Sequence, residues 1–209
     1  MSESPKSKLG RPRDPERLRR VLEAAEQLFL EQGFERTSVE AVAKASEVSK
    51  MTIYSYFPTK KALFEATIVR RVDAAFDFQS DAELPPSDPR KGLTIIGRHF
   101  LALIRVDEVI CKQRVLYAEA GVQQDACSAF FQQGPLNIVA RVRAYLDSAV
   151  ATGSLVFHDT EAGADQFLSL FLGTAHIKVM LGLGKPTPEE DERLLERNVE
   201  MMMRAYGRS

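Results

Sequence analysis

The chain is 209 residues long, enough to bury a core without disulfide or metal staples, and its 44% hydrophobic and 27% charged residues are ordinary for a globular protein. The formal net charge of −1 excludes a general polycation, although residues 1–61 are mildly basic and the remainder is acidic, as in proteins that offer one end to a polyanion. The two cysteines, Cys111 and Cys127, have no CxxC spacing, which argues against a disulfide framework and a thiolate zinc site.

An N-terminal arm precedes the first helix. Residues 1–13 are rich in Ser, Lys and Pro, so they are expected to form a disordered basic arm, and they lack the apolar run of a secretory signal. Asp14 and Pro15 are typical of a helix start, and apolar residues at three- and four-residue steps over 18–29 predict an amphipathic helix. Gly33 is expected to end that helix as a C-terminal cap.

Two short helices are expected next. Thr37 and Glu40 are spaced for a capping box at the start of the second helix. Ser49 is placed to cap a third helix over about 50–56, after a tight connection at 46–48. Three short helices, of which the second and third are joined by a three-residue turn, predict a helix-turn-helix, whose third helix fits the major groove of DNA.

The rest of the chain has helical periodicity and no convincing strand alternation. Thr59 is expected to open a long helix to about residue 78, before a proline-rich loop. Further helices are expected over 90–106, 109–120, 126–150 with a kink at Gly134 and Pro135, 160–183 and 188–206. The predicted fold class is therefore all-α, with about nine helices.

The most apolar stretch, residues 167–184, is expected to be a buried or partner-facing helix. It contains Ser169, Thr174, His176 and Lys178, whose burial in lipid would be costly. We therefore expect a cytoplasmic protein without a membrane partner.

The segments LFLEQGF, TSVEAVAKAS and VSKMTIYSYFPTKKALF follow one another within the stretch from Arg17 to Ala66. In spacing, helix length and turn position this stretch of about fifty residues resembles the TetR family of bacterial transcription regulators. The resemblance implies a helix-turn-helix DNA-binding domain over 14–60 and a larger helical domain over 61–209 that binds a ligand and dimerises.

The resemblance also implies a role for each matched position. The expected base contacts on the recognition helix are Lys50, Met51, Thr52 and Ser55. The expected phosphate contacts are Ser38, Ser49, Tyr54, Tyr56 and Lys60. For the two tyrosines the alternative is simple packing, and for Lys60 it is a solvated surface position.

Two further features bear on DNA binding. In the arm, Arg11 and Arg13 flank a proline and suit the minor groove of A·T-rich DNA, the alternative being a solvated tail. Where many family members have glycine or another small residue, this chain has Glu47. If that position needs a left-handed backbone, Glu47 costs roughly 1 kcal/mol and brings a negative charge near DNA.

The C-terminal part is expected to hold both the ligand pocket and the dimer interface. The expected pocket residues are Phe76, Phe100, Tyr117, Phe130, Phe131 and His176, each of which has a plain structural role as its alternative. The expected interface residues are Phe167, Leu170, Phe171, Thr174, Ile177, Leu195, Val199 and Met202. The competing explanation of these two apolar stripes is an ordinary monomer core.

The sequence thus predicts a homodimeric regulator, most simply a repressor, that leaves a palindromic double-stranded DNA operator when a small apolar or amphipathic effector binds. Catalysis is not expected, because the three histidines are scattered and no nucleophile or phosphate-loop motif occurs. No metal and no cofactor are expected. An architectural DNA-binding protein and a redox regulator acting through Cys111 and Cys127 are the remaining alternatives.

Overall fold

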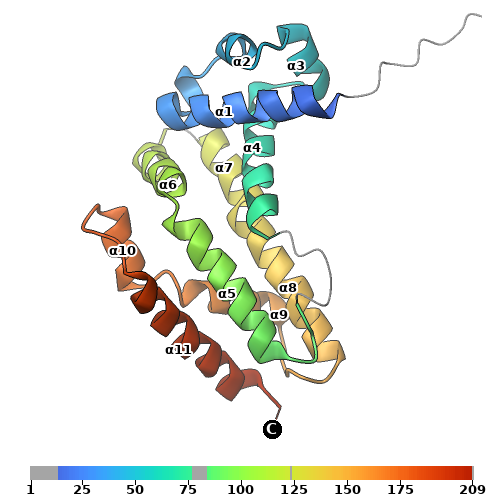
Figure 1. The fold of residues 1–209 in the computed structure, drawn as a ribbon, viewed down its shortest axis with the longest axis vertical. Coiled ribbons are helices and arrows are strands. Elements are labelled where there is room, and N and C mark those ends of the chain that lie inside the picture. The colour runs from blue at the N-terminus through green and yellow to red at the C-terminus, as the bar shows by residue number, and fades with distance from the viewer. Residues whose placement is uncertain (1–13, 77–83, 123, 209) are drawn as a thin grey trace, which may run out of the picture. The chain divides into compact units, whose positions relative to one another are not determined.

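Residues 14–76, 84–122 and 124–208 are described by the computed structural model (Figure 1). Within these ranges the chain forms eleven helices, and its only strand-like pairing is an isolated β-bridge between Leu155 and Gly207. The all-α prediction is confirmed. The helices belong to two compact units that divide after Leu63, inside α4 (Lys60–Ala75). The arm predicted over 1–13 lies outside the described residues.

The first unit consists of α1 (Pro15–Arg36), α2 (Val39–Ser46), α3 (Lys50–Tyr56) and the start of α4. Asp14 caps α1 as predicted, because its side chain accepts hydrogen bonds from the backbone N–H groups of Glu16 and Arg17. The apolar stripe of α1 packs against α2 and α3. The buried residues of this small core are Val21, Ala25, Phe29, Val39, Val42, Val48, Ile53 and Leu63.

Gly33, which was expected to end the first helix as a C-terminal cap, interrupts α1 instead. Its φ of 78° and ψ of 171° lie in a region open almost only to glycine, and one further turn of helix follows to Arg36. The break turns the chain and leaves carbonyl groups of α1 without helical partners. Thr37, which is buried, donates its hydroxyl hydrogen to the carbonyl oxygens of Leu28 and Gly33, at 3.0 and 2.8 Å.

The capping box expected at Thr37 and Glu40 is therefore wrong. Ser38 caps α2 instead, and its hydroxyl accepts a hydrogen bond from the N–H of Ala41 at 3.1 Å. Thr37 is unavailable for capping because its hydroxyl serves the broken end of α1. Glu47 ends α2 with φ 54° and ψ 31°, so the left-handed backbone considered for this position is present on a residue with a side chain.

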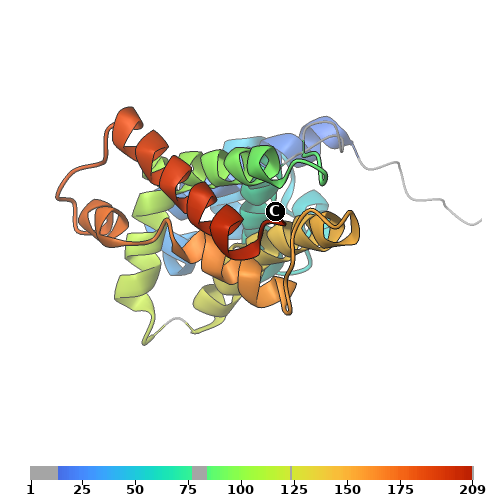
Figure 2. The ribbon, with the colours of Figure 1, turned by 90° about the horizontal axis from the view of Figure 1, so that it is seen from below.

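The second unit contains the rest of α4 and seven further helices. These are α5 (Pro89–Arg105), α6 (Asp107–Glu119), α7 (Gln124–Gln133), α8 (Pro135–Ala151), α9 (Thr160–Ser169), α10 (Thr174–Met180) and α11 (Pro188–Tyr206). Figures 1 and 2 show α11 running alongside α5, and α9 packing against α8.

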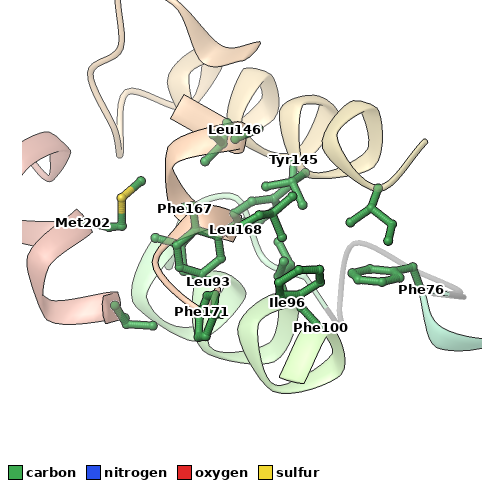
Figure 3. Close-up of a cluster of buried hydrophobic side chains, with 14 of the residues drawn as sticks. Phe76, Leu93, Ile96, Phe100, Tyr145, Leu146, Phe167, Leu168, Phe171 and Met202 are labelled. Atoms are coloured by element: carbon green, nitrogen blue, oxygen red, sulfur yellow. The ribbon is translucent and has the colours of Figure 1, made fainter. Parts of the chain in front are cut away.

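One hydrophobic cluster forms the centre of this unit (Figure 3). Phe167 and Phe171 are fully buried in it, and their rings meet edge to face with centroids 5.3 Å apart. Leu93 and Ile96 of α5 and Met202 of α11 lie in the same cluster. The burial of these large side chains from α5, α9, α11 and the turn after α9 stabilises the unit chiefly through the hydrophobic effect.

Two of the expected long helices are divided, which accounts for eleven helices against about nine expected. The helix predicted over 126–150 ends before Gly134, whose ψ of −93° is not helical, and α8 restarts at Pro135. The helix predicted over 160–183 breaks between Leu170 and Gly173. At that break the ψ of Gly173 is −160°, and the chain turns after Phe171 has reached the core.

Candidate DNA interface and ligand cavity

The recognition helix α3 is anchored on one side and open on the other. Ser49 caps it, since its hydroxyl accepts a hydrogen bond from the N–H of Thr52 at 3.2 Å. Ile53 is 1% exposed and holds the inner face against the core of the first unit. On the outer face Met51 is 80% exposed, and Lys50, Tyr54 and Ser55 are exposed as well. The predicted base-contacting side chains therefore share one accessible face, with Thr52 half-buried at its edge.

Lys50 forms an ion pair with Glu40 of α2. The ammonium group also lies 5.7 Å from the centroid of the Tyr54 ring. The carboxylate of Glu40 raises the pKa of Lys50, and the ammonium in turn lowers the pKa of Glu40. Sequence reasoning missed Glu40, because the contact depends on the angle between α2 and α3 and leaves no signal in residue spacing.

Tyr56 holds the first unit together. Its hydroxyl oxygen accepts a hydrogen bond from the backbone N–H of Asp14 at 3.2 Å, which ties the end of α3 to the start of α1. The side chain is half-buried. Tyr56 therefore has a structural role beside the phosphate contact predicted for it.

Lys60 is occupied by an intramolecular contact. Its ammonium group donates to the carbonyl oxygens of Phe34 and Glu35 at 2.8 and 3.1 Å, and lies 4.4 Å from the centroid of the Phe34 ring. These carbonyls belong to the last turn of α1, beyond the break at Gly33. Lys60 therefore satisfies carbonyl groups at the C-terminal end of α1. The sequence predicted either a phosphate contact or a solvated surface position, and neither interpretation included this role.

The remaining DNA contacts predicted from the sequence differ in their surroundings. Ser38 and Ser49 are exposed at helix starts, and both hydroxyls accept hydrogen bonds from the backbone. The hydroxyl of Ser55 donates to the carbonyl of Thr52 at 2.6 Å. Arg11 and Arg13 lie outside the described residues.

A cavity of about 190 Å³ lies in the second unit. Four of the six predicted pocket residues line it, namely Phe100, Tyr117, Phe130 and His176. Further apolar lining comes from Ile68, Val72, Leu103, Ile104, Ile138 and Leu168. An apolar enclosure with a few polar groups is the usual character of a small-molecule site.

Two pocket predictions need correction. Phe76 is 3% exposed and packs in the hydrophobic cluster rather than lining the cavity (Figure 3). Phe131 is 52% exposed and lies next to Phe130 in sequence, but one position along a helix turns its side chain about 100° away.

Two buried polar atoms belong to residues that line the cavity. Among the described residues, none is hydrogen-bonded to Nδ1 of His176 or to Oε1 of Gln113. Burial and the nearby charge of Arg105 lower the pKa of His176, which keeps its imidazole neutral at pH 7. Sequence reasoning missed Gln113, because a glutamine on a polar helix carries no sign of burial.

Two arginines join helices of the second unit, Arg105 linking α5 to α11 and Arg114 linking α6 to α10. Arg105 makes two hydrogen bonds, of 3.0 and 2.9 Å, to the carboxylate of Asp191 in α11, and both side chains are mostly buried. Arg114 of α6 donates to the carbonyl oxygens of Val179 and Met180 at 2.5 and 2.9 Å, at the C-terminal end of α10. One wall of the cavity is thus held by charge-assisted contacts.

Most of the predicted dimer interface is buried inside the chain's own core. Five of the predicted interface residues are only 0 to 3% exposed and belong to the hydrophobic cluster, namely Phe167, Phe171, Leu195, Val199 and Met202. The monomer-core explanation therefore applies to these five, because they pack in one cluster with side chains of α5. Leu170 is half-buried, whereas Thr174 and Ile177 on α10 are exposed.

Apolar side chains do reach the surface nearby. Those on or just after α10 are Ile177, Leu181 and Leu183, which are 54 to 67% exposed. On α11, Met201 is 55% exposed. We call Ile177, Leu181, Leu183 and Met201 the α10–α11 surface set.

The described residues also bear on metal binding, membrane insertion and thiol chemistry. Across residues 14–76, 84–122 and 124–208, no group of three His, Cys, Asp or Glu side chains is arranged to hold a metal ion. Nor does this part of the chain contain a helix with the length and apolarity needed to cross a membrane. Cys111 and Cys127 are both free thiols, the first exposed and the second half-buried.

Two family models match the chain. A model described as bacterial regulatory proteins of the tetR family matches residues 21–67, which contain the helix-turn-helix. A model described as the C-terminal domain of AefR-like transcriptional repressors matches residues 91–208.

Relatives of known name are similar over different shares of the chain. The HTH-type transcriptional regulator EthR of Mycolicibacterium smegmatis is 33% identical over 98 residues, which cover 44% of this chain and 44% of EthR. The regulator YuxN of Bacillus subtilis is 32% identical over 85 residues, only 29% of its own length. The chain thus spans less than half of these two relatives. YvkB of Bacillus subtilis is 24% identical over 90% of this chain and 96% of its own.

Solved structures resemble the whole chain. The structure titled Flavonoid-responsive Regulator FrrA is 32% identical, covers 93% of this chain and 98% of its own, and has a TM-score of 0.71. A TetR-family protein from Mesorhizobium loti is 22% identical with a TM-score of 0.76, covers 95% of this chain and 100% of its own, and shows the fold alone.

Proposed function

The chain belongs to the TetR family of bacterial transcription regulators, and on that premise we propose that it is a homodimeric repressor of a palindromic operator. A small apolar or amphipathic effector binds in the cavity of the second unit and releases the DNA. The outer face of α3 is the observation that carries the proposal. Lys50, Met51, Tyr54 and Ser55 are gathered there, and each is exposed with respect to the described residues.

The base and phosphate contacts follow from that face. Lys50 donates to guanine, and Met51 packs on a thymine methyl group. Tyr54 and the helix-start serines Ser38 and Ser49 contact phosphates. Lys60 can contact a phosphate only if its ammonium group donates hydrogen bonds to the phosphate as well as to the carbonyl oxygens of α1.

Dimerisation accounts for the palindrome. A single helix-turn-helix contacts one half-site, so a two-fold dimer binds a pseudopalindrome. The α10–α11 surface set supplies exposed apolar area for the contact between copies. Its members take the place of the buried residues that the sequence suggested.

Control by an effector has two supports. The cavity is largely apolar and lies within the second unit, and most of its lining residues fall in the part matched by the model of AefR-like repressor C-terminal domains. FrrA, which is 32% identical, is described as flavonoid-responsive, so flavonoids belong in the first set of compounds to test. The effector acts by stabilising one spacing of the two recognition helices, while DNA stabilises another.

Selection of bound duplexes from random DNA tests the DNA-binding part of the proposal. We expect one short palindrome for the full chain and a changed preference at one position of each half-site for Lys50→Ala. Lys91→Ala removes an equal charge from an exposed position on α5 and should select the same palindrome as the original chain. Salt-sensitive binding without sequence preference would support the architectural alternative instead.

A further inference from the structure

The cavity combines aromatic walls with a small polar corner. Phe100 of α5 and Phe130 of α7 supply rings, and Tyr117 of α6, which is 62% exposed, lies where the wall reaches solvent. The corner consists of His176 on α10 and Gln113 on α6, two helices that contact each other. Both residues bury a hydrogen-bonding atom that no described residue satisfies.

We propose that the cavity binds a small aromatic compound with a phenolic hydroxyl, which hydrogen-bonds to Gln113 and His176 while its ring packs between Phe100 and Phe130. The inference rests on the proposed function, since it names the chemical class of the effector. It assigns two polar residues to a site whose remaining lining is largely apolar.

The hydrogen-bonding inventory selects a hydroxyl group. Oε1 of Gln113 can only accept, so the ligand must donate a hydrogen there. Because that hydrogen goes to Gln113, the ligand oxygen accepts a hydrogen bond from Nδ1 of His176, which then carries the proton of the neutral imidazole. A carboxylate has no hydrogen for Gln113. Buried polar groups in proteins are nearly always hydrogen-bonded, and one ligand hydroxyl would supply a partner for both Oε1 of Gln113 and Nδ1 of His176.

Charge and size narrow the class further. Of the described residues that line the cavity, Arg71 and Lys112 are basic and Asp165 is acidic, so the lining offers a cationic ligand no surplus of negative charge. A volume of about 190 Å³ is slightly larger than the roughly 150 Å³ of an apolar cavity that holds benzene. One aromatic ring with a short apolar substituent therefore fits, and larger polyphenols require the walls to move.

Calorimetric titration of the full chain with four matched compounds tests the assignment. We expect 4-ethylphenol to bind at least about tenfold more tightly than ethylbenzene, which lacks the hydroxyl, and than 4-ethylanisole, which can only accept. The carboxylate 4-ethylbenzoate should bind more weakly than 4-ethylphenol. Failure of 4-ethylphenol to bind at millimolar concentration, or equal binding of ethylbenzene, overturns the proposal.

Variants assign the preference to the polar corner. Gln113→Leu should reduce the ratio of 4-ethylphenol to ethylbenzene affinity to near one while ethylbenzene still binds. Gln132→Leu, on exposed α7 surface, should leave the ratio unchanged. His176→Asn provides a second variant of the same corner, and thermal melting checks that each protein folds. Retention of the full ratio in both corner variants overturns the assignment.

Release of the selected operator DNA separates this inference from the proposed function. Release by a flavonoid or by 4-ethylbenzoate, without binding of 4-ethylphenol, overturns the phenol assignment and leaves the effector-controlled repressor intact. Binding of 4-ethylphenol through Gln113 without release of DNA by any compound supports the site and overturns effector control.

Discussion

At the scale of single residues, Lys50, the proposed base contact, forms an ion pair with Glu40. The ion pair is exposed and has to open if the ammonium is to reach a base. We expect Glu40→Gln to tighten operator binding by about two- to fivefold at low salt, since no contact is lost on binding. The measurement is a fluorescence-anisotropy titration at several salt concentrations.

Glu47→Gln is the matched control for Glu40→Gln. It removes the same charge from the neighbourhood of α3, but its carboxylate lies 3.5 Å from Arg20 and has no contact with Lys50. Equal tightening by both variants would show a general charge effect, and the positioning role of Glu40 would be refuted.

His176 is the buried histidine of the second unit, and burial with the charge of Arg105 lowers its pKa below 6.5. As pH falls through 6.5, the unfolded chain takes up this proton before the folded chain does. The free energy of unfolding therefore decreases as pH falls from 7.5 to 5.5. Urea unfolding at both values should show a smaller decrease for His176→Gln.

Exposed His158 supplies the comparison for this pH effect. His158→Gln should retain the pH dependence of the original chain. An unchanged pH dependence in His176→Gln would mean that the folded protein accepts the proton on His176 without penalty.

At the scale of helices, close approach depends on Gly97 of α5. A Cβ atom there would lie 2.5 Å from Cδ1 of Leu195 and 2.9 Å from Cζ of Phe171, both of which are buried. Gly97→Ala should lower the free energy of unfolding by about 1–2 kcal/mol, because overpacking outweighs the better helix propensity of alanine. Denaturant unfolding measures the change.

Gly121→Ala is the control, since a Cβ atom at that position meets nothing within 4 Å. We expect its free energy of unfolding to change by less than about 0.5 kcal/mol. If Gly97→Ala is equally mild, α5 and α11 have room to separate and the helix contact at Gly97 is looser than the structure indicates.

At the scale of the whole molecule, the proposed binding to a palindromic operator requires the pairing of two chains. Ile177 and Leu181 are 54% and 67% exposed, so replacing both by Glu leaves the core of each chain intact. We expect Ile177→Glu with Leu181→Glu to sediment as a monomer and to lose at least about a hundredfold in operator affinity, because one half-site remains. Sedimentation velocity and anisotropy are the measurements.

Val156→Glu places a charge on another exposed apolar position of the second unit, at 47% exposure. It should sediment as the original chain does. A stable dimer in the double variant would assign the contact between copies to another surface, such as the exposed face of α11 around Met201.

Much of the local structure could be predicted from the sequence, because a helix start depends on hydrogen bonds between residues close together in the chain. Asp14 and Ser49 accept hydrogen bonds from N–H groups two or three residues ahead, and Gly33 takes a backbone conformation that its own lack of Cβ permits. The predicted range of the third helix, about 50–56, agrees with the observed helix Lys50–Tyr56. The spacing of apolar and polar residues along α3 likewise predicts which face is exposed, because Ile53 lies on the opposite, buried face.

Contacts between distant segments were decided by the tertiary structure alone. Apolar periodicity cannot tell a subunit interface from a core, so Phe167 and Leu195 were assigned to the surface although both are buried. The pairing of Lys50 with Glu40 and the unpaired atom of Gln113 depend on angles between helices. The sequence by itself determined the family, through the resemblance of its motifs, and it determined the all-α class and the three helices of the helix-turn-helix, because helix starts and apolar periodicity are local properties. The cavity and the surface left for a partner were decided by how the helices pack, which no single segment encodes.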